Sequence, residues 1–131
     1  MRLFAISLAL ASLTASGLAA PASSAPEASS ALSSGDAGRG KVIYQACQAC
    51  HSIDEDDVGP RHRGVVGRRA GTVEGYAYSP ALKNSGLLWD PATLDQWLAG
   101  PQKLVPGAKM FFSLAKPQDR ADVIAYLEQL R

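Results

Sequence analysis

The sequence predicts an all-α domain, with three main helices, a few short ones and long loops between them. Three segments open with residues that favour helix starts and continue with apolar residues at helical spacing, namely 36–44, 90–98 and 116–130. The segments between them are rich in glycine, and none gives a convincing sheet pattern. Loops of this length are uncommon in a small domain, so we expect them to wrap around a bound group.

Each main helix has its own start signal. Asp36 can cap the first helix, Asp90 can cap the second, and Pro117 suits the first turn of the third. A glycine-proline pair at residues 100–101 ends the second helix. The residues expected to face the core are Leu94, Trp97 and Leu98 in the second helix, and Val123, Tyr126, Leu127 and Leu130 in the third.

The N-terminus predicts a secretory signal peptide and therefore a periplasmic protein. One arginine precedes an uncharged run that ends near residue 20, and Ala20-Pro21-Ala22 fits a cleavage site of small residues. The alternative is an uncleaved membrane anchor, for which the run is only weakly apolar. The expected organisation is a signal peptide at 1–22, an Ala/Ser/Pro-rich flexible tether at 23–35 and one folded domain at 36–131.

The charge balance argues against a nucleic-acid partner. The chain has 13 Lys and Arg against 12 Asp and Glu, and the leader and tether hold one of each sign. The folded part therefore lacks the basic field that nucleic acid requires. The acidic run at 54–57 lacks the spacing and glycine of a calcium loop, and we interpret it as a solvated loop.

The stretch CQACH, residues 47–51, contains both cysteines of the chain and one of its two histidines. A dithiol enzyme would need a strand before this motif, whereas the preceding residues look helical. Zinc would need Cys47, Cys50, His51 and His62 together, although His51 directly follows Cys50. Thiols at i and i+3 lie on one side of a helical turn, where each can add to a porphyrin vinyl group. The motif therefore predicts one covalently bound haem c with His51 on its iron.

Met110 and His62 are the two candidates for the second axial position. His62 follows His51 by only eleven residues, so a short loop should keep it on the same side of the iron. Met110 lies far along the chain, directly after a turn-forming Pro-Gly pair and two further residues. A lone methionine is commonly a core residue, but His/Met pairs bind haem iron, and we predict that His51 and Met110 are the ligands.

Five segments then point to one family: GKVIYQACQACH, GPRHRGVVGRRAG, GYAYSPALKNSGLLWD, LDQWLAGPQKLVPGAKMFF and DRADVIAYLEQL. With them, residues 36–131 resemble class I cytochrome c, of the bacterial type close to cytochrome c2 and mitochondrial cytochrome c. The resemblance implies the small class I fold around one haem. It also implies a one-electron carrier that cycles between Fe(II) and Fe(III) and is not an enzyme.

The resemblance implies roles for further residues. The carbonyl of Pro60 is expected to accept the outer N–H of His51, which fixes the tautomer of that ring. The first and last helices are expected to cross at Gly40, against Val123 and Tyr126. Three residues are expected to surround and hydrogen-bond the inner haem propionate: Arg68, Tyr78 and Trp89.

The chain departs from the family pattern on the methionine side. Trp97 stands where many relatives have a tyrosine, and its indole is expected to pack against the haem. Leu82 replaces an asparagine of the haem-cavity water network, and Ala108 replaces a threonine. These changes remove polar groups and predict a drier network there, without changing the ligand set.

The implied carrier would act in brief complexes at its exposed haem edge. The expected partners are a cytochrome bc1-type donor and an oxidase, photosynthetic centre or dehydrogenase, and the carrier is expected to be a monomer. Two alternatives remain open: an enzyme or gas sensor in which Met110 leaves the iron free, and a subunit of a larger redox complex. The lysines considered for docking are Lys41, Lys83, Lys103, Lys116 and, as the strongest candidate, Lys109.

Overall fold

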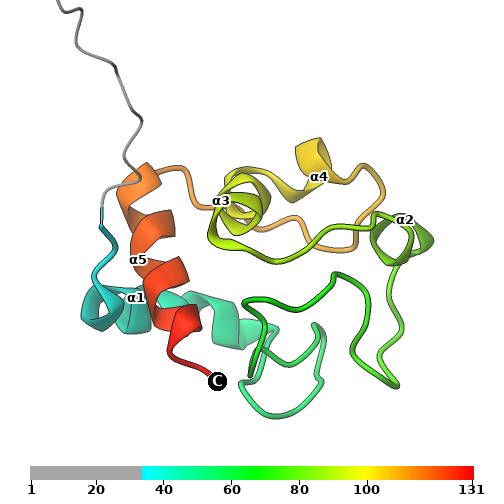
Figure 1. Ribbon diagram of the computed structural model, residues 1–131, viewed down its shortest axis with the longest axis horizontal. Helices are drawn as coiled ribbons and strands as arrows, with labels where there is room; N and C mark the ends of the chain where they lie inside the picture. Colours follow the sequence, from blue (N-terminus) through cyan, green and yellow to red (C-terminus); the bar gives the residue numbers. More distant parts are fainter. Residues whose placement is uncertain (1–33) are drawn as a thin grey trace, which may run out of the picture.

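The computed structural model describes residues 34–131, so the predicted signal peptide and nearly all of the predicted tether lie outside the described residues. Between residues 34 and 131 no strand is present, and a single isolated bridge joins Arg69 to Leu88. The predicted all-α class is therefore confirmed. The helices, drawn in Figure 1, are α1 (Ala37–Ile43), the 3₁₀ helix η1 (Tyr44–Ala49), α2 (Pro80–Lys83), α3 (Pro91–Ala99), α4 (Pro101–Leu104) and α5 (Pro117–Glu128).

The predicted helix starts are present. The carboxylate of Asp36 accepts the N–H of Arg39 at 3.0 Å, and that of Asp90 accepts the N–H of Thr93 at 2.7 Å. Pro117 is the first residue of α5. The longest helix, α5, has 12 residues, and no helix in the described part is long and apolar enough to cross a membrane.

The first helix differs from the expectation in one respect. The α-helix ends at Ile43, and residues 44–49 continue as a tighter 3₁₀ helix that contains Cys47 and ends directly before Cys50. In a 3₁₀ helix residues three apart lie directly above one another, so Cys47 and the following Cys50 come to the same side.

Helices α1 and α5 cross at one end of the molecule (Figure 1). A Cβ on Gly40 would lie 1.9 Å from the carbonyl oxygen of Asp122 and 3.0 Å from Cβ of Tyr126. The crossing glycine is therefore as predicted, but its nearest neighbour is the backbone of Asp122 and not Val123. Gly35, which the sequence analysis placed in the tether, also packs against α5, because a Cβ on Gly35 would meet the carbonyl of Ala121.

The core joins the two crossed helices to α3. Its buried members include Tyr44, Leu94, Val123 and Leu127, which come from η1, α3 and α5. The long segment 50–79 lies on the other side of the molecule from α3 (Figure 1). These elements surround the cavity that forms the candidate site.

Candidate functional site

A cavity of about 420 Å³ lies between α3 and the long loop segment. Most of its lining is apolar, as is usual for cofactor sites. Both thiols line it, Cys47 half-buried and Cys50 exposed, and both cysteines are free. His51, Met110 and all of the other predicted site residues also line this cavity: Pro60, Arg68, Tyr78, Trp89 and Trp97.

The thiols are positioned by backbone bonds at the end of η1. The carbonyl of Cys47 accepts the N–H of Cys50 at 3.1 Å and that of His51 at 2.9 Å, so the three residues form one turn. Burial raises the pKa of the Cys47 thiol, which is therefore protonated at neutral pH. Reactive dithiol centres instead lower the pKa of their nucleophilic thiol. The shift at Cys47 is thus opposite to that of a reactive dithiol centre.

His51 is held with one ring nitrogen directed to the backbone. Its Nδ1 lies 2.8 Å from the carbonyl oxygen of Pro60, as predicted, and because a carbonyl only accepts, Nδ1 carries the proton. Nε2 is then left with a free lone pair, which is the form that binds metals. Burial lowers the pKa of His51 and so favours the neutral ring. Gly59 packs against this ring, since a Cβ there would lie 2.1 Å from Cε1.

His62 covers a face of the same ring. The two imidazoles stack with centroids 4.0 Å apart and an interplanar angle of 22°, so His62 lies on the His51 side of the site, as the short loop predicted. The hydroxyl of Tyr44 is 2.9 Å from Nδ1 of His62. Burial lowers the pKa of His62 to about 3, so this ring is neutral. Sequence reasoning considered His62 only as a ligand and missed its contact with Tyr44.

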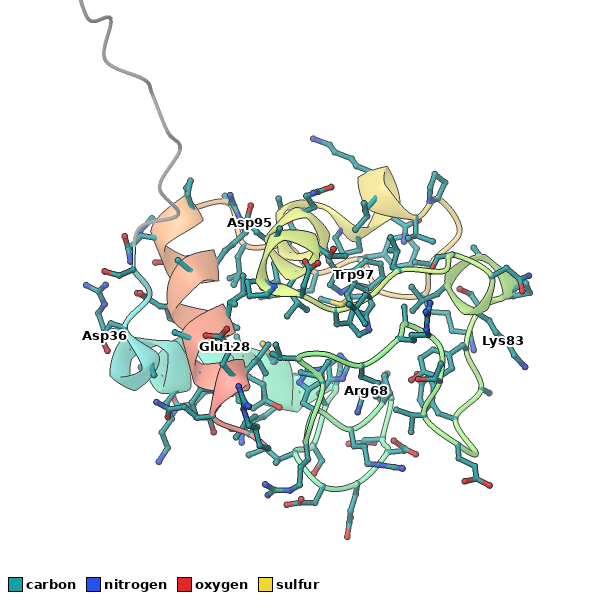
Figure 2. The ribbon with its side chains drawn as sticks, viewed as in Figure 1. Asp36, Arg68, Lys83, Asp95, Trp97 and Glu128 are labelled. Carbon is teal, nitrogen blue, oxygen red and sulfur yellow. The ribbon has the colours of Figure 1, made fainter. Side chains whose placement is uncertain are left out.

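The methionine side of the cavity is largely apolar. Leu82 and Trp97 are buried and line the cavity beside Met110, and Ala108 is buried in the adjoining turn. In Figure 2 the side chain of Trp97 extends from α3 toward the middle of the molecule. Gln102 makes hydrogen bonds to the backbone around Met110 and was not identified from the sequence.

Arg68 brings a positive charge to the cavity. Its guanidinium donates to the carbonyls of Arg61 and Arg63 at 2.8 and 3.1 Å, and it forms no ion pair with any described residue. Burial is the main cause of the lowered pKa of Arg68. Burial of Tyr78 is likewise the main cause that raises the pKa of its hydroxyl. A half-buried cation without a carboxylate partner fits an anionic group of a bound molecule. Figure 2 shows Arg68 on the loop segment that faces α3.

The acidic run does not contribute to the cavity as a metal site. Residues 54–57 are exposed, and two of them pair with arginines of the same loop, Asp54 with Arg63 and Asp56 with Arg61. In the described part of the chain no three His, Cys, Asp or Glu residues converge as metal ligands. The donor set of two thiols, one imidazole and one thioether around an apolar cavity therefore fits a haem better than a bare ion.

Three exposed apolar side chains surround the opening of the cavity. Phe111, Val58 and Phe112 line it and remain 78%, 71% and 43% exposed, respectively. Exposed apolar groups of this size are typical of contact surfaces. The sequence analysis had considered only lysines for docking, and the signal it missed is the Phe-Phe pair directly after Met110.

Comparisons with known proteins agree with this geometry. The family model for cytochrome c matches residues 37–131, and the chain belongs to the cytochrome c family. It is 49% identical over 102 residues to cytochrome c2 of Rhodomicrobium vannielii, covering 75% of this chain and 82% of that protein. Cytochrome c2 of Rhodoblastus acidophilus is 46% identical over 101 residues, which cover 74% of this chain and 94% of the relative.

Solved structures of cytochromes c also resemble this chain. Cytochrome cH from Methylobacterium extorquens superposes with a TM-score of 0.71 at 50% identity, covering 72% of this chain and 99% of that one. Ferricytochrome c2 from Rhodopseudomonas palustris superposes with a TM-score of 0.70 at 38% identity, covering 73% of this chain and 99% of that one. The predicted class I fold is confirmed, as are one covalently attached haem c and a cytochrome c2-like function in one-electron transport.

Proposed function

We propose that Cys47 and Cys50 attach the haem through thioethers and that His51 and Met110 are its axial ligands. The observation that carries this assignment is the hydrogen bond from Nδ1 of His51 to Pro60, which leaves Nε2 free in a cavity that Met110 also lines. Haem iron bound in this way changes between Fe(II) and Fe(III) and has no open position for a substrate. The protein is then a carrier and not an enzyme.

The remaining lining residues bind and shield the group. Arg68, Tyr78 and Trp89 are proposed to surround one haem propionate, because Arg68 is half-buried and has no ion pair among the described residues. Trp97 is proposed to pack against the macrocycle, since the residue is only 8% exposed and lines the cavity. Together these residues exclude water and balance charge around the cofactor.

Electrons are proposed to pass to transient redox partners at the cavity opening. Lys109 is exposed beside Met110, and its ammonium donates to the carbonyl of Ala77. With Phe111 and Phe112 next to it, the docking surface combines one cation with apolar area. Such complexes are small and short-lived.

Residues 1–22 are proposed to direct export to the periplasm and to be cleaved there. The mature carrier is proposed to be a monomer.

The first test is the haem spectrum of protein made with haem-maturation machinery. Haem that stays with the chain in denaturing alkaline pyridine, with a two-thioether spectrum, supports attachment at Cys47 and Cys50. The native protein should show a methionine–iron band that Met110→Ala removes and Phe111→Ala, its exposed neighbour, retains. Ready binding of carbon monoxide by the unaltered protein, without that band, would instead support an open-site sensor or enzyme.

A further inference from the structure

The loop that carries Met110 makes few hydrogen bonds within its own backbone. In the described structure residues 107–113 take part in five hydrogen bonds. One joins the N–H of Ala108 to the carbonyl of Val105, and one joins the side chain of Lys109 to Ala77. The other three all involve Gln102. The conformation of this loop therefore depends largely on one side chain outside it.

Gln102 uses both ends of its amide group. Its Nε2 donates to the carbonyl of Ala108 at 2.6 Å and to the carbonyl of Met110 at 2.9 Å, and its Oε1 accepts the N–H of Gly107 at 3.3 Å. The three partners fix the orientation of the amide, because a flipped group would place its oxygen against two carbonyl oxygens. Gln102 thus joins the turn before Met110 to the methionine itself.

The helix that carries Gln102 is itself held in place. Pro101 at the start of α4 is buried, and its carbonyl accepts the N–H of Val105 at 2.8 Å. The carbonyl of Gly100 accepts the N–H groups of Lys103 and Leu104 at 3.0 and 3.2 Å. Because α4 directly follows α3 and is in contact with it, Gln102 connects the methionine loop to the pair of helices that carries Trp97.

Few other polar groups hold the loop. Leu82 and Ala108 are buried on this side of the site and have no side-chain donor or acceptor. We propose that Gln102 is a positioning residue that latches the 107–110 backbone to α4 and so holds Met110 against the iron. This inference rests on the proposed ligation by Met110. Loss of the latch should open the loop more often and let small ligands replace the methionine.

The test measures how fast imidazole displaces methionine from the oxidised holoprotein, followed by loss of the methionine–iron band. Gln102→Met keeps the length of the side chain and removes all three hydrogen bonds. We expect displacement to be roughly 10- to 100-fold faster, given the usual net worth of such bonds. The matched control is Lys103→Met, an exposed neighbour on α4, which should stay within about twofold of the unaltered protein.

Amide hydrogen exchange of residues 107–113 gives a second readout that does not require ligation. Faster exchange in Gln102→Met than in Lys103→Met supports the latch. Unchanged exchange and unchanged displacement overturn it, as does equal acceleration by the control. If the unaltered protein has no methionine–iron band, the proposed ligation fails, and with it the role of Gln102 toward the iron. The exchange data then decide only whether Gln102 holds the loop.

Discussion

Tyr44 and His62 form a polar pair beside His51. The pair is joined by a single 2.9 Å hydrogen bond, and His62 stacks on the ring of His51. Burial raises the pKa of the Tyr44 hydroxyl to about 12, so it stays protonated. The hydroxyl therefore has a hydrogen to donate to the neutral His62, and the bond restrains the ring that covers the proposed ligand.

Tyr44→Phe should destabilise the haem-bound protein by about 1–3 kcal/mol. The change leaves Nδ1 of His62 without its partner in a poorly solvated position, which costs more than an exposed hydrogen bond. Urea unfolding of the holoprotein measures the effect. Tyr126→Phe is the control. The ring centroids of Tyr126 and Tyr44 are 5.1 Å apart, but the hydroxyl of Tyr126 makes no hydrogen bond to His62 in the described structure. Equal losses in the two variants would contradict the prediction.

The contact between α1 and α5 depends on Gly40, because any larger residue there would clash with the backbone of α5. The carbonyl of Asp122, 1.9 Å from a Cβ on Gly40, belongs to the backbone of a helix and cannot move aside alone. A larger residue must separate the two helices. Helix α5 supplies Val123 to the lining of the cavity, and η1, which directly continues α1, supplies Tyr44. Packing at the crossing is therefore linked to the geometry of the site.

Gly40→Ala should lower the free energy of unfolding by about 3 kcal/mol, because overpacking forces backbone shifts. Gly38→Ala, in the same helix, is the matched control. A Cβ there meets only the flexible carboxylate of Asp36 at 3.1 Å, and the gain in helix propensity is about 0.5–1 kcal/mol. Denaturant midpoints of the two variants measure the difference. A midpoint for Gly40→Ala close to that of the control would rule out a tight crossing.

Asp122 fastens the start of the folded chain to α5. Its carboxylate is buried and accepts the N–H of Asp36 at 2.7 Å, the amide of Gln118 at 2.9 Å and the guanidinium of Arg39 at 3.1 Å. The bond from Asp36 is the main cause that holds the pKa of Asp122 below its ordinary value of 3.8. The folded state therefore favours the ionised carboxylate.

The sign of the pH effect follows from this shift. A carboxyl group with a lowered folded pKa adds stability that is complete above its unfolded pKa and is lost as the pH falls through the folded pKa. Asp122→Asn should therefore be less stable near neutral pH and should lose less further stability on acidification below pH ~4. Unfolding midpoints measured from neutral to acid pH test this, with Asp119→Asn on the same helix as control. Parallel curves for the variant and the unaltered protein would contradict it.

At the scale of the whole molecule, we expect the haem to complete the core. The cavity of about 420 Å³ is lined by residues from η1, α3 and α5 and from the long loops. An unfilled apolar cavity leaves its lining side chains without packing partners, and a domain has only about 5–15 kcal/mol of total stability to lose. The long loops are expected to order around the group because their apolar residues have no other core to enter.

The double variant Cys47→Ala/Cys50→Ala, which cannot attach haem covalently, should lose most of its cooperative structure. Far-UV circular dichroism should show less helix, and size-exclusion chromatography should show an expanded chain. Cys50→Ala alone keeps one possible anchor and is expected to retain more holoprotein than the double variant. A haem-free double variant with the helix content and cooperative unfolding of the holoprotein would show that the fold does not depend on the cofactor.

The sequence alone determined the features that depend on neighbouring residues. Asp36 and Asp90 cap their helices because a cap needs only the next three residues. The CQACH motif indicated covalent haem because attachment requires thiols at that spacing. The contact between Pro60 and His51, implied by family resemblance, is also present. Membership in the cytochrome c family and the all-α fold are confirmed by the comparisons.

Only the tertiary structure decided the contacts between distant segments. The crossing at Gly40 was expected, but its closest contact with the backbone of Asp122 was not. The bond between Tyr44 and His62 and the bonds from Gln102 to the Met110 loop also join positions that no local pattern relates. Tyr44, His62 and Gln102 are common polar residues whose partners are determined by packing. Caps and the haem motif use short-range geometry that a sequence encodes directly, whereas these contacts exist because the folded chain closes around one cavity.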